Sequence, residues 1–238
     1  MKVSVCTVAY NEAEWIDACV RQFQPYIDRH VVLVSSLPWH GRRLRDDGTA
    51  NLARRAGAEV HVQHWPSESE QRNWGLARLF DSDYVLVIDA DEFFERSGLE
   101  LLLAELGRSA GPCYRAAGMR TYWKTKDYVC YPYEGWDSPV IAVDPKRVKF
   151  SMQRQLQPID EDRRLIAPEL PVLLHHMSWV KSDEKVREKI ETFSHAGHIR
   201  EGWFENVWKK WTPDLDDIAP YGNDRIRAIF EPCPPLGC

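Results

Sequence analysis

The sequence of 238 residues predicts an α/β fold, a three-layer sandwich around a mostly parallel sheet, with further helices toward the C-terminus. Two observations carry this prediction. In the first half of the chain, short runs of β-branched residues alternate with amphipathic stretches, which is the pattern of strands joined by crossover helices. The run YVLVI at 84–88 is apolar throughout, as expected of a strand that is buried on both faces at the centre of a sheet.

The same periodicities place the elements in order along the chain. At the start of one predicted helix, Ser67 precedes Glu70 by three residues, which is the arrangement of a capping box. Glycines, prolines and an aromatic segment in the second half predict short strands and loops. Strands are predicted at 3–8, 30–34, 59–63 and 84–88, and helices at 12–23, 48–56, 67–80, 97–106, 181–200 and 204–211.

Composition and charge exclude several classes of protein. The 31 basic and 36 acidic residues give a net charge of -5, so there is no clear signal for a nucleic-acid partner. The six cysteines contain no Cys-x-x-Cys pair, and the first apolar run is too short for a signal peptide or a transmembrane segment. We therefore expect a cytoplasmic protein, which would dock peripherally if it works near a membrane.

The segment VLVIDADEFF places Asp89 and Asp91 at the carboxyl end of the central strand, the edge at which α/β sheets bind ligands. Alternation along a strand would project both carboxylates to one side. Unit like charges about 4 Å apart repel by roughly 4 kcal/mol at an effective dielectric constant near 20, so such a pair favours a shared Mg²⁺ or Mn²⁺ ion that also binds phosphate oxygens. Alternatively, the two aspartates cap the next helix or lie in a solvated turn.

Three segments, VSVCTVAYNEAEW, QRNWG and VLVIDADE, resemble family 2 glycosyltransferases, which have the GT-A fold. The resemblance extends through most of the chain. It implies that Asp89 and Asp91 bind a metal ion and the diphosphate of a nucleotide-sugar donor. It also implies that the end of the first strand lies beside the base and ribose, through Val8, Ala9, Tyr10, Asn11 and Glu12.

Two further segments are similar to parts of the same family. In SESEQRNWG, Arg72 and Asn73 match residues that approach the nucleotide or organise its pocket, although Arg72 by itself could equally be a solvated helix residue. In VLLHHMSWVKSDEKVREKIETFSH, His176 best matches a histidine that completes the metal or diphosphate site, with His175 as the alternate. An imidazole ligand favours Mn²⁺ over Mg²⁺. The alternative is a histidine pair satisfied by backbone carbonyls.

Two parts of the site are not assigned by these motifs. Many relatives end the second strand in an acidic residue that recognises uracil, whereas this chain offers Ser35 and Ser36.

Inverting transfer needs a general base near the acceptor hydroxyl, and the segment YPYEGWDSP offers Asp137 first and Glu134 second, with Trp136 as a wall for the acceptor. Alternatively, both acids are ordinary surface residues.

We therefore predict a metal-dependent, inverting glycosyltransferase that uses a nucleotide-sugar donor and a carbohydrate, lipid-linked or other hydroxyl acceptor. Residues 1–95 would form the half that binds the nucleotide-sugar, 96–230 the acceptor-side half of the same domain, and 231–238 a loose tail. A catalytically inactive nucleotide-sugar-binding protein is the alternative. A phosphohydrolase of the haloacid dehalogenase type is a weaker one, because its aspartate motif belongs on the first strand.

Overall fold

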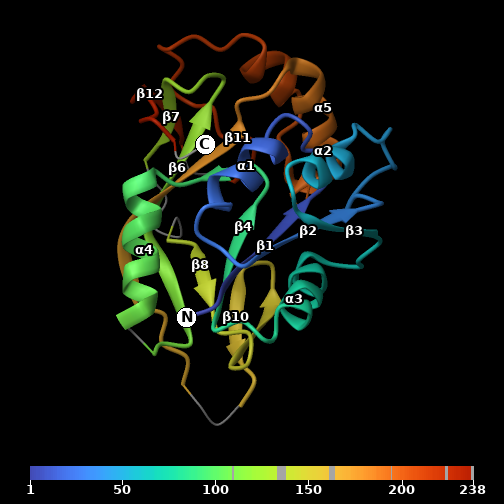
Figure 1. Ribbon diagram of the computed structural model, residues 1–238. Helices are drawn as coiled ribbons and strands as arrows, with labels where there is room; N and C mark the ends of the chain where they lie inside the picture. The colour runs from blue at the N-terminus through green and yellow to red at the C-terminus, as the bar shows by residue number, and fades with distance from the viewer. Residues whose placement is uncertain (109, 133–137, 161–163, 194, 223–224, 237–238) are drawn as a thin grey trace.

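The computed structural model describes residues 1–108, 110–132, 138–160, 164–193, 195–222 and 225–236. A mixed sheet forms its centre, with the strand order β12-β7-β6-β8-β4-β1-β2-β3 (Figure 1). The strands on this path are β1 Val3–Ala9, β2 Arg29–Ser35, β3 Glu59–Gln63, β4 Tyr84–Asp89, β6 Cys113–Trp123, β7 Tyr128–Tyr131, β8 Val140–Val143 and β12 Arg227–Phe230.

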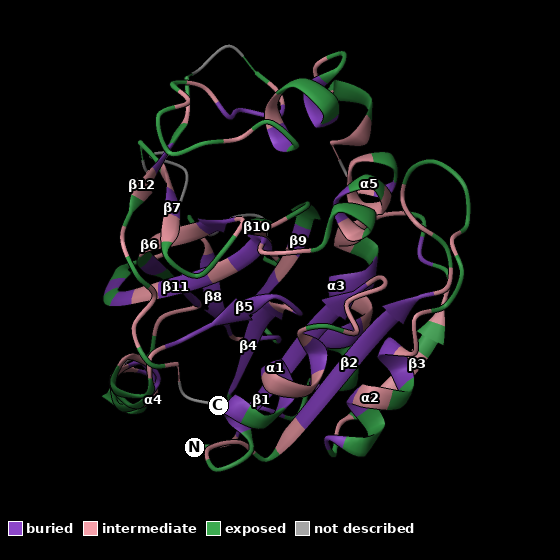
Figure 2. Cartoon of the chain, turned by 90° about the horizontal axis from the view of Figure 1, so that it is seen from above, coloured by how far each residue is buried: buried purple, intermediate pink, exposed green. Residues whose placement is uncertain are grey.

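Strands β4, β1, β2 and β3 are parallel to one another, so their carboxyl ends share one edge of the sheet. β4 pairs with β1 on one side and with the antiparallel strand β8 on the other, which makes it a central strand. Figure 2 shows β1, β2 and β4 buried along most of their length. The apolar run at 84–88 is therefore correctly predicted as the middle of the sheet.

Three more strands complete the architecture. β11 (Glu169–Trp179) pairs in parallel with β6 and also binds the two-residue strand β5 (Glu92–Phe93) in antiparallel orientation. In this register His176 lies opposite Glu92. β9 (Val148–Met152) and β10 (Gln155–Pro158) form a separate hairpin.

Helices cover both faces of the sheet, so the predicted three-layer sandwich is confirmed. Phe23 of one helix and Leu102 of another pack with Val5 on one face, while Leu76 of a third packs with Val8 on the opposite face. The helices are α1 Ile16–Phe23, α2 Thr49–Arg55, α3 Glu68–Arg78, α4 Arg96–Arg108 and α5 Asp183–Thr192, with a 3₁₀ turn at Ala196–His198 and a π-helical turn at Phe204–Trp208.

Helix α3 lies unusually close to the sheet. A Cβ atom added at Gly75 would lie 2.3 Å from the Cys6 Sγ atom in β1, so a glycine is required at this point of contact. At the start of α3, Ser67 accepts a hydrogen bond from the Glu70 amide, as the capping pattern predicts. Both features fix the position of α3 beside the carboxyl end of β4.

Three predicted elements differ from the structure. α1 begins at Ile16 rather than at residue 12, because the backbone leaves β1 through Asn11 at a φ of 53° and then turns. α5 ends at Thr192 rather than at residue 200, because Phe193 is extended. The last predicted helix is a single π-helical turn over Phe204–Trp208.

The segment after residue 230 is held against the fold rather than loose. The amides of Glu231 and Cys233 donate to the carbonyls of Asp127 and Lys126, and Leu236 forms a β-bridge with Glu95. The prediction of a loose tail is therefore wrong for residues 231–236. Proline-rich composition indicated low secondary structure, but it could not reveal these long-range backbone contacts.

A buried histidine in β2 makes the stability of the fold sensitive to acid. His30 is 6% exposed, and burial lowers its pKa to about 3 from an ordinary 6.5. The unfolded chain takes up the proton first, so the contribution to stability is complete above the unfolded pKa and is lost as the pH falls toward 3. We expect the free energy of unfolding to fall by about 2 kcal/mol between pH 8 and pH 5 on account of this residue. Chemical denaturation of His30→Gln should show that this part of the pH dependence has gone; an unchanged profile would contradict the prediction.

Candidate functional site

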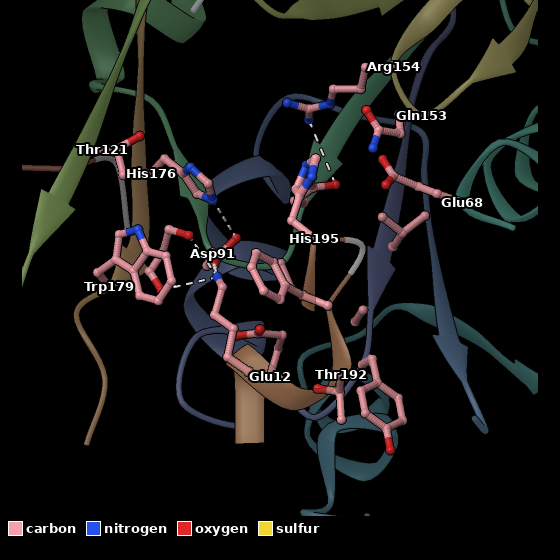
Figure 3. Close-up of a pocket in the computed structure, with 18 of the residues that line it drawn as sticks. Glu12, Glu68, Asp91, Thr121, Gln153, Arg154, His176, Trp179, Thr192 and His195 are labelled. Carbon is pink, nitrogen blue, oxygen red and sulfur yellow. Dashed lines mark hydrogen bonds and ion pairs between the residues drawn. The ribbon is translucent and has the colours of Figure 1, made fainter. Parts of the chain in front are cut away.

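A pocket of about 640 Å³ opens at the shared carboxyl edge of the parallel strands. It is lined from one side by the end of β1 and the turn after β4, and from the other by β11 and α5 (Figure 3). The Tyr10 hydroxyl accepts a hydrogen bond from the Leu44 amide at 3.0 Å, and the Asn11 side chain donates to the Arg45 carbonyl. All the residues predicted at the end of the first strand line this pocket, namely Val8, Ala9, Tyr10, Asn11 and Glu12.

The first aspartate of the pair, Asp89, is the last residue of β4 and is held by arginine. Arg72, 1% exposed, places Nη2 2.6 Å from Asp89 Oδ1 and 2.7 Å from Glu68 Oε1. Burial alone would raise the pKa of Asp89, but the charges of Arg154 and Arg72 outweigh it and lower that pKa. Arg72 is therefore a buried residue that contacts Asp89 at the pocket, and not a solvated helix residue.

The second aspartate, Asp91, lies in the turn between β4 and β5 and faces His176 of β11. His176 Nε2 lies 3.3 Å from Asp91 Oδ1, and Figure 3 shows the two side chains pointing toward each other. Burial opposes ionisation of Asp91, but the charges of His176, Lys189 and Lys181 outweigh it and hold the pKa of Asp91 well below its usual range. Conversely, Asp91 raises the pKa of His176 against the effect of burial.

The pair formed by Asp91 and His176 is suited to a divalent cation. A carboxylate oxygen and an imidazole nitrogen this close can bind one ion, and their combination favours Mn²⁺. In the described ranges, no group of three or more His, Cys, Asp or Glu side chains is arranged to hold a metal ion. Asp89 Oδ1 is engaged by Arg72. The residues therefore fit a cation with two protein ligands that leaves several positions for diphosphate oxygens.

The neighbouring histidine, His175, points to the other side of β11, as alternation along a strand requires. Its Nδ1 lies 3.0 Å from the Tyr122 hydroxyl, and its Nε2 lies 3.6 Å from Glu95 Oε1. Burial lowers the pKa of His175. Of the two histidines, only His176 lines the pocket.

Beneath the aspartates lies a buried ion pair that the sequence did not indicate. Glu92, 1% exposed, accepts from both terminal nitrogens of Arg154, at 2.6 and 2.5 Å, and also accepts from the Asp89 amide at 2.8 Å. Arg154 comes from the β9–β10 hairpin, directly after Gln153, whose φ is 46°. This hairpin thereby supports the turn that carries both aspartates.

Not every predicted site residue reaches the pocket. The Asn73 side chain instead donates to the Phe150 carbonyl and accepts from the Phe150 amide, which ties α3 to the hairpin. Asp137, Glu134 and Trp136 lie outside the described residues. Asn73 therefore does not line the pocket. Of the two roles that the resemblance implies, its contact with the hairpin that carries Arg154 agrees with organising the pocket rather than with approaching the nucleotide.

Three lysines of the pocket were also missed: Lys181, Lys185 and Lys189. They are spaced four residues apart in a stretch predicted as helix. Lys185 and Lys189 lie in α5, where this spacing puts them on one face, whereas Lys181 precedes the helix. The signal was thus present in the sequence. The sequence did not indicate which loops these lysines would contact.

The chain is similar to several solved structures, at low sequence identity and low TM-score. A mycobacterial protein is 21% identical, with 50% of this chain and 41% of that chain covered and a TM-score of 0.41. Glucosyl-3-phosphoglycerate synthase from Mycobacterium tuberculosis, solved with Mn²⁺, UDP and glucosyl-3-phosphoglycerate, is 22% identical (51% and 44% covered, TM-score 0.38). Mannosyl-3-phosphoglycerate synthase from Rubrobacter xylanophilus is 22% identical (51% and 41%, TM-score 0.41). The chain thus spans less than half the length of these structures.

No curated protein matches the chain. Across the described residues, the helices are all too short or too polar to cross a membrane. A family model, described as glycosyl transferase family 2, matches residues 4–183. This match includes the end of β1, both aspartates and His176, and it agrees with the GT-A sandwich that the sequence predicts. Because the match covers well over half of its length, the chain belongs to glycosyl transferase family 2.

Proposed function

We propose that this protein transfers a sugar from a nucleotide-diphosphate donor to an acceptor hydroxyl and that the reaction depends on a divalent cation at Asp91 and His176. Family membership supports the class of reaction. The single observation that carries the cation is the 3.3 Å approach of His176 Nε2 to Asp91 Oδ1 in the pocket. A cation bound there would neutralise charge on the leaving diphosphate.

Other residues of the pocket would bind the nucleotide and orient Asp89. The end of β1 would receive the base and ribose, because residues 8–12 line the pocket beside the turn that carries Asp91. Arg72 would hold the Asp89 carboxylate in a fixed orientation toward the donor, since its buried guanidinium contacts that group directly. Fixed charges of this kind need no reorganisation when the donor arrives.

For the acceptor side, we retain Asp137 as the proposed general base, with Glu134 second. The base would take the proton of the acceptor hydroxyl as its oxygen attacks the anomeric carbon, while the diphosphate leaves from the opposite face. This geometry inverts the anomeric centre, as the family resemblance implies. The acceptor would be a carbohydrate, a lipid-linked molecule or another hydroxyl compound.

Removal of the cation provides the test. We expect nucleoside diphosphates with Mn²⁺ to stabilise the protein against heat, by about 2.7 kcal/mol at a hundred times the dissociation constant, and we expect this effect to disappear in EDTA. Transfer from a panel of nucleotide-sugars should stop under the same conditions and return when Mn²⁺ is added back. Full transfer in EDTA would show that the cation is not required, and stabilisation without transfer or donor hydrolysis would favour the inactive alternative.

A further inference from the structure

Lys185 and Lys189 of α5, together with Lys181 just before the helix, connect this segment to three loops of the donor pocket. Each ammonium group faces a carboxylate from a different loop, and the three loops follow β1, β2 and β4. The pairs are Lys181 with Glu12 at 2.5 Å, Lys185 with Asp47 at 2.8 Å and Lys189 with Asp91 at 3.7 Å.

Both members of the pair between Lys185 and Asp47 also form hydrogen bonds with backbone atoms of the loop after β1. Asp47 Oδ2 also accepts from the Ala13 amide at 3.1 Å, and Lys185 Nζ donates to the Asn11 carbonyl at 3.4 Å. One lysine therefore ties the loop after β2 to the loop after β1. The Lys185 and Asp47 side chains are 21% and 14% exposed, so water screens this pair less than it screens an exposed pair.

A close backbone approach joins the same loop to the other end of α5. Gly41 has a φ of 68°, and a Cβ atom added there would lie 2.4 Å from the Glu191 carbonyl oxygen. The His40 amide donates to the Thr192 carbonyl at 3.4 Å. The loop over residues 36–48 contains no strand or helix of its own, and α5 therefore contacts it at both ends.

We propose that α5 is a clamp that positions the three donor-site loops, with Lys185 as its central positioning residue. The inference rests on the proposed function in taking these loops as the donor site. It accounts for the four-residue spacing of Lys185 and Lys189, because this spacing places both side chains on the face of α5 that is directed at the loops. In this arrangement Lys185 affects donor affinity through Asp47 and the loop backbone rather than through the reacting atoms.

Hydrogen exchange of the ligand-free protein tests the clamp without any assumption about the donor. In Lys185→Met, amides in 36–48 should exchange faster than in the wild type, whereas Lys185→Arg should restore protection. Arg187→Met is the matched control, because Arg187 is a cation of the same helix that pairs with the exposed Glu205. Gly41→Ala should also accelerate exchange, since it forces the loop away from α5 with every charge retained. Unchanged exchange in both Lys185→Met and Gly41→Ala would overturn the proposal.

The second experiment measures the binding of UDP and of GDP, each with Mn²⁺, and tests whether α5 affects donor affinity. For whichever nucleotide binds the wild type, Lys185→Met and Asp47→Asn should each raise the dissociation constant roughly tenfold, and the double variant should raise it by about the same factor because both changes break one interaction. If the factors by which the two single substitutions raise the dissociation constant multiplied in the double variant, the proposal would be overturned. If neither nucleotide binds the wild type, the donor class is wrong, while the exchange measurement still decides the role of α5.

Discussion

Asp91→Asn is expected to reduce sugar transfer by about a thousandfold or more, which corresponds to about 4 kcal/mol of transition-state stabilisation. The amide keeps the shape of the side chain but removes the charge that faces His176 and lies 3.7 Å from Lys189. Steady-state transfer with the nucleotide-sugar that the panel identifies, at saturating Mn²⁺, measures the loss. Circular dichroism should show that the fold is retained.

Asp81→Asn is the matched control for this variant. Asp81 is also an ion-paired aspartate, but its side chain is 61% exposed and its partners are Lys2 and Arg29 at the surface. Its replacement should leave transfer unchanged. If Asp91→Asn kept near-normal turnover, the cation site would have to lie elsewhere in the pocket.

Arg154→Met is expected to have the largest effect on stability, a decrease of about 3–5 kcal/mol in the free energy of unfolding at neutral pH. The change leaves the Glu92 carboxylate, 1% exposed, without the guanidinium that donates hydrogen bonds to both of its oxygens. Burial already raises the pKa of Glu92 while Arg154 opposes that effect. Denaturant titration measures the loss.

The pH dependence of the same variant provides a second check. Without Arg154, the folded-state pKa of Glu92 rises further above its unfolded value, so protonation of Glu92 favours the folded state and the deficit shrinks as the pH falls. Adding Glu92→Gln should recover part of the lost stability at neutral pH. A deficit that is independent of pH and is not reduced by Glu92→Gln would mean that lost packing, rather than the buried charge, explains the effect.

The parts of this protein that sequence predicts well are those that depend on local pattern. The strand at Glu59–Gln63 and the Ser67 cap follow from residues that are adjacent or three apart in the chain. The approach of His176 to Asp91 was inferred through family resemblance. In the structure it results from the pairing of β11 with β5.

The parts that sequence does not reveal depend on contacts between distant segments. Arg154 reaches Glu92 across 62 positions of the chain, and Lys185 reaches Asp47 across 138. No periodicity within a helix or hairpin indicates which carboxylate such a cation will meet. For the same reason, Asn73 carried a plausible motif but turns to Phe150, a residue 77 positions away.

The pairing of charges in the pocket also bears on how a donor arrives. Arg72, Arg154, Lys181, Lys185 and Lys189 already face carboxylates at short range. Opposite charges held this close largely cancel beyond a Debye length of about 8 Å at physiological salt, so they produce little long-range attraction for an anion. We therefore expect this pocket to distinguish ligands after contact rather than to capture them by electrostatic steering from solution.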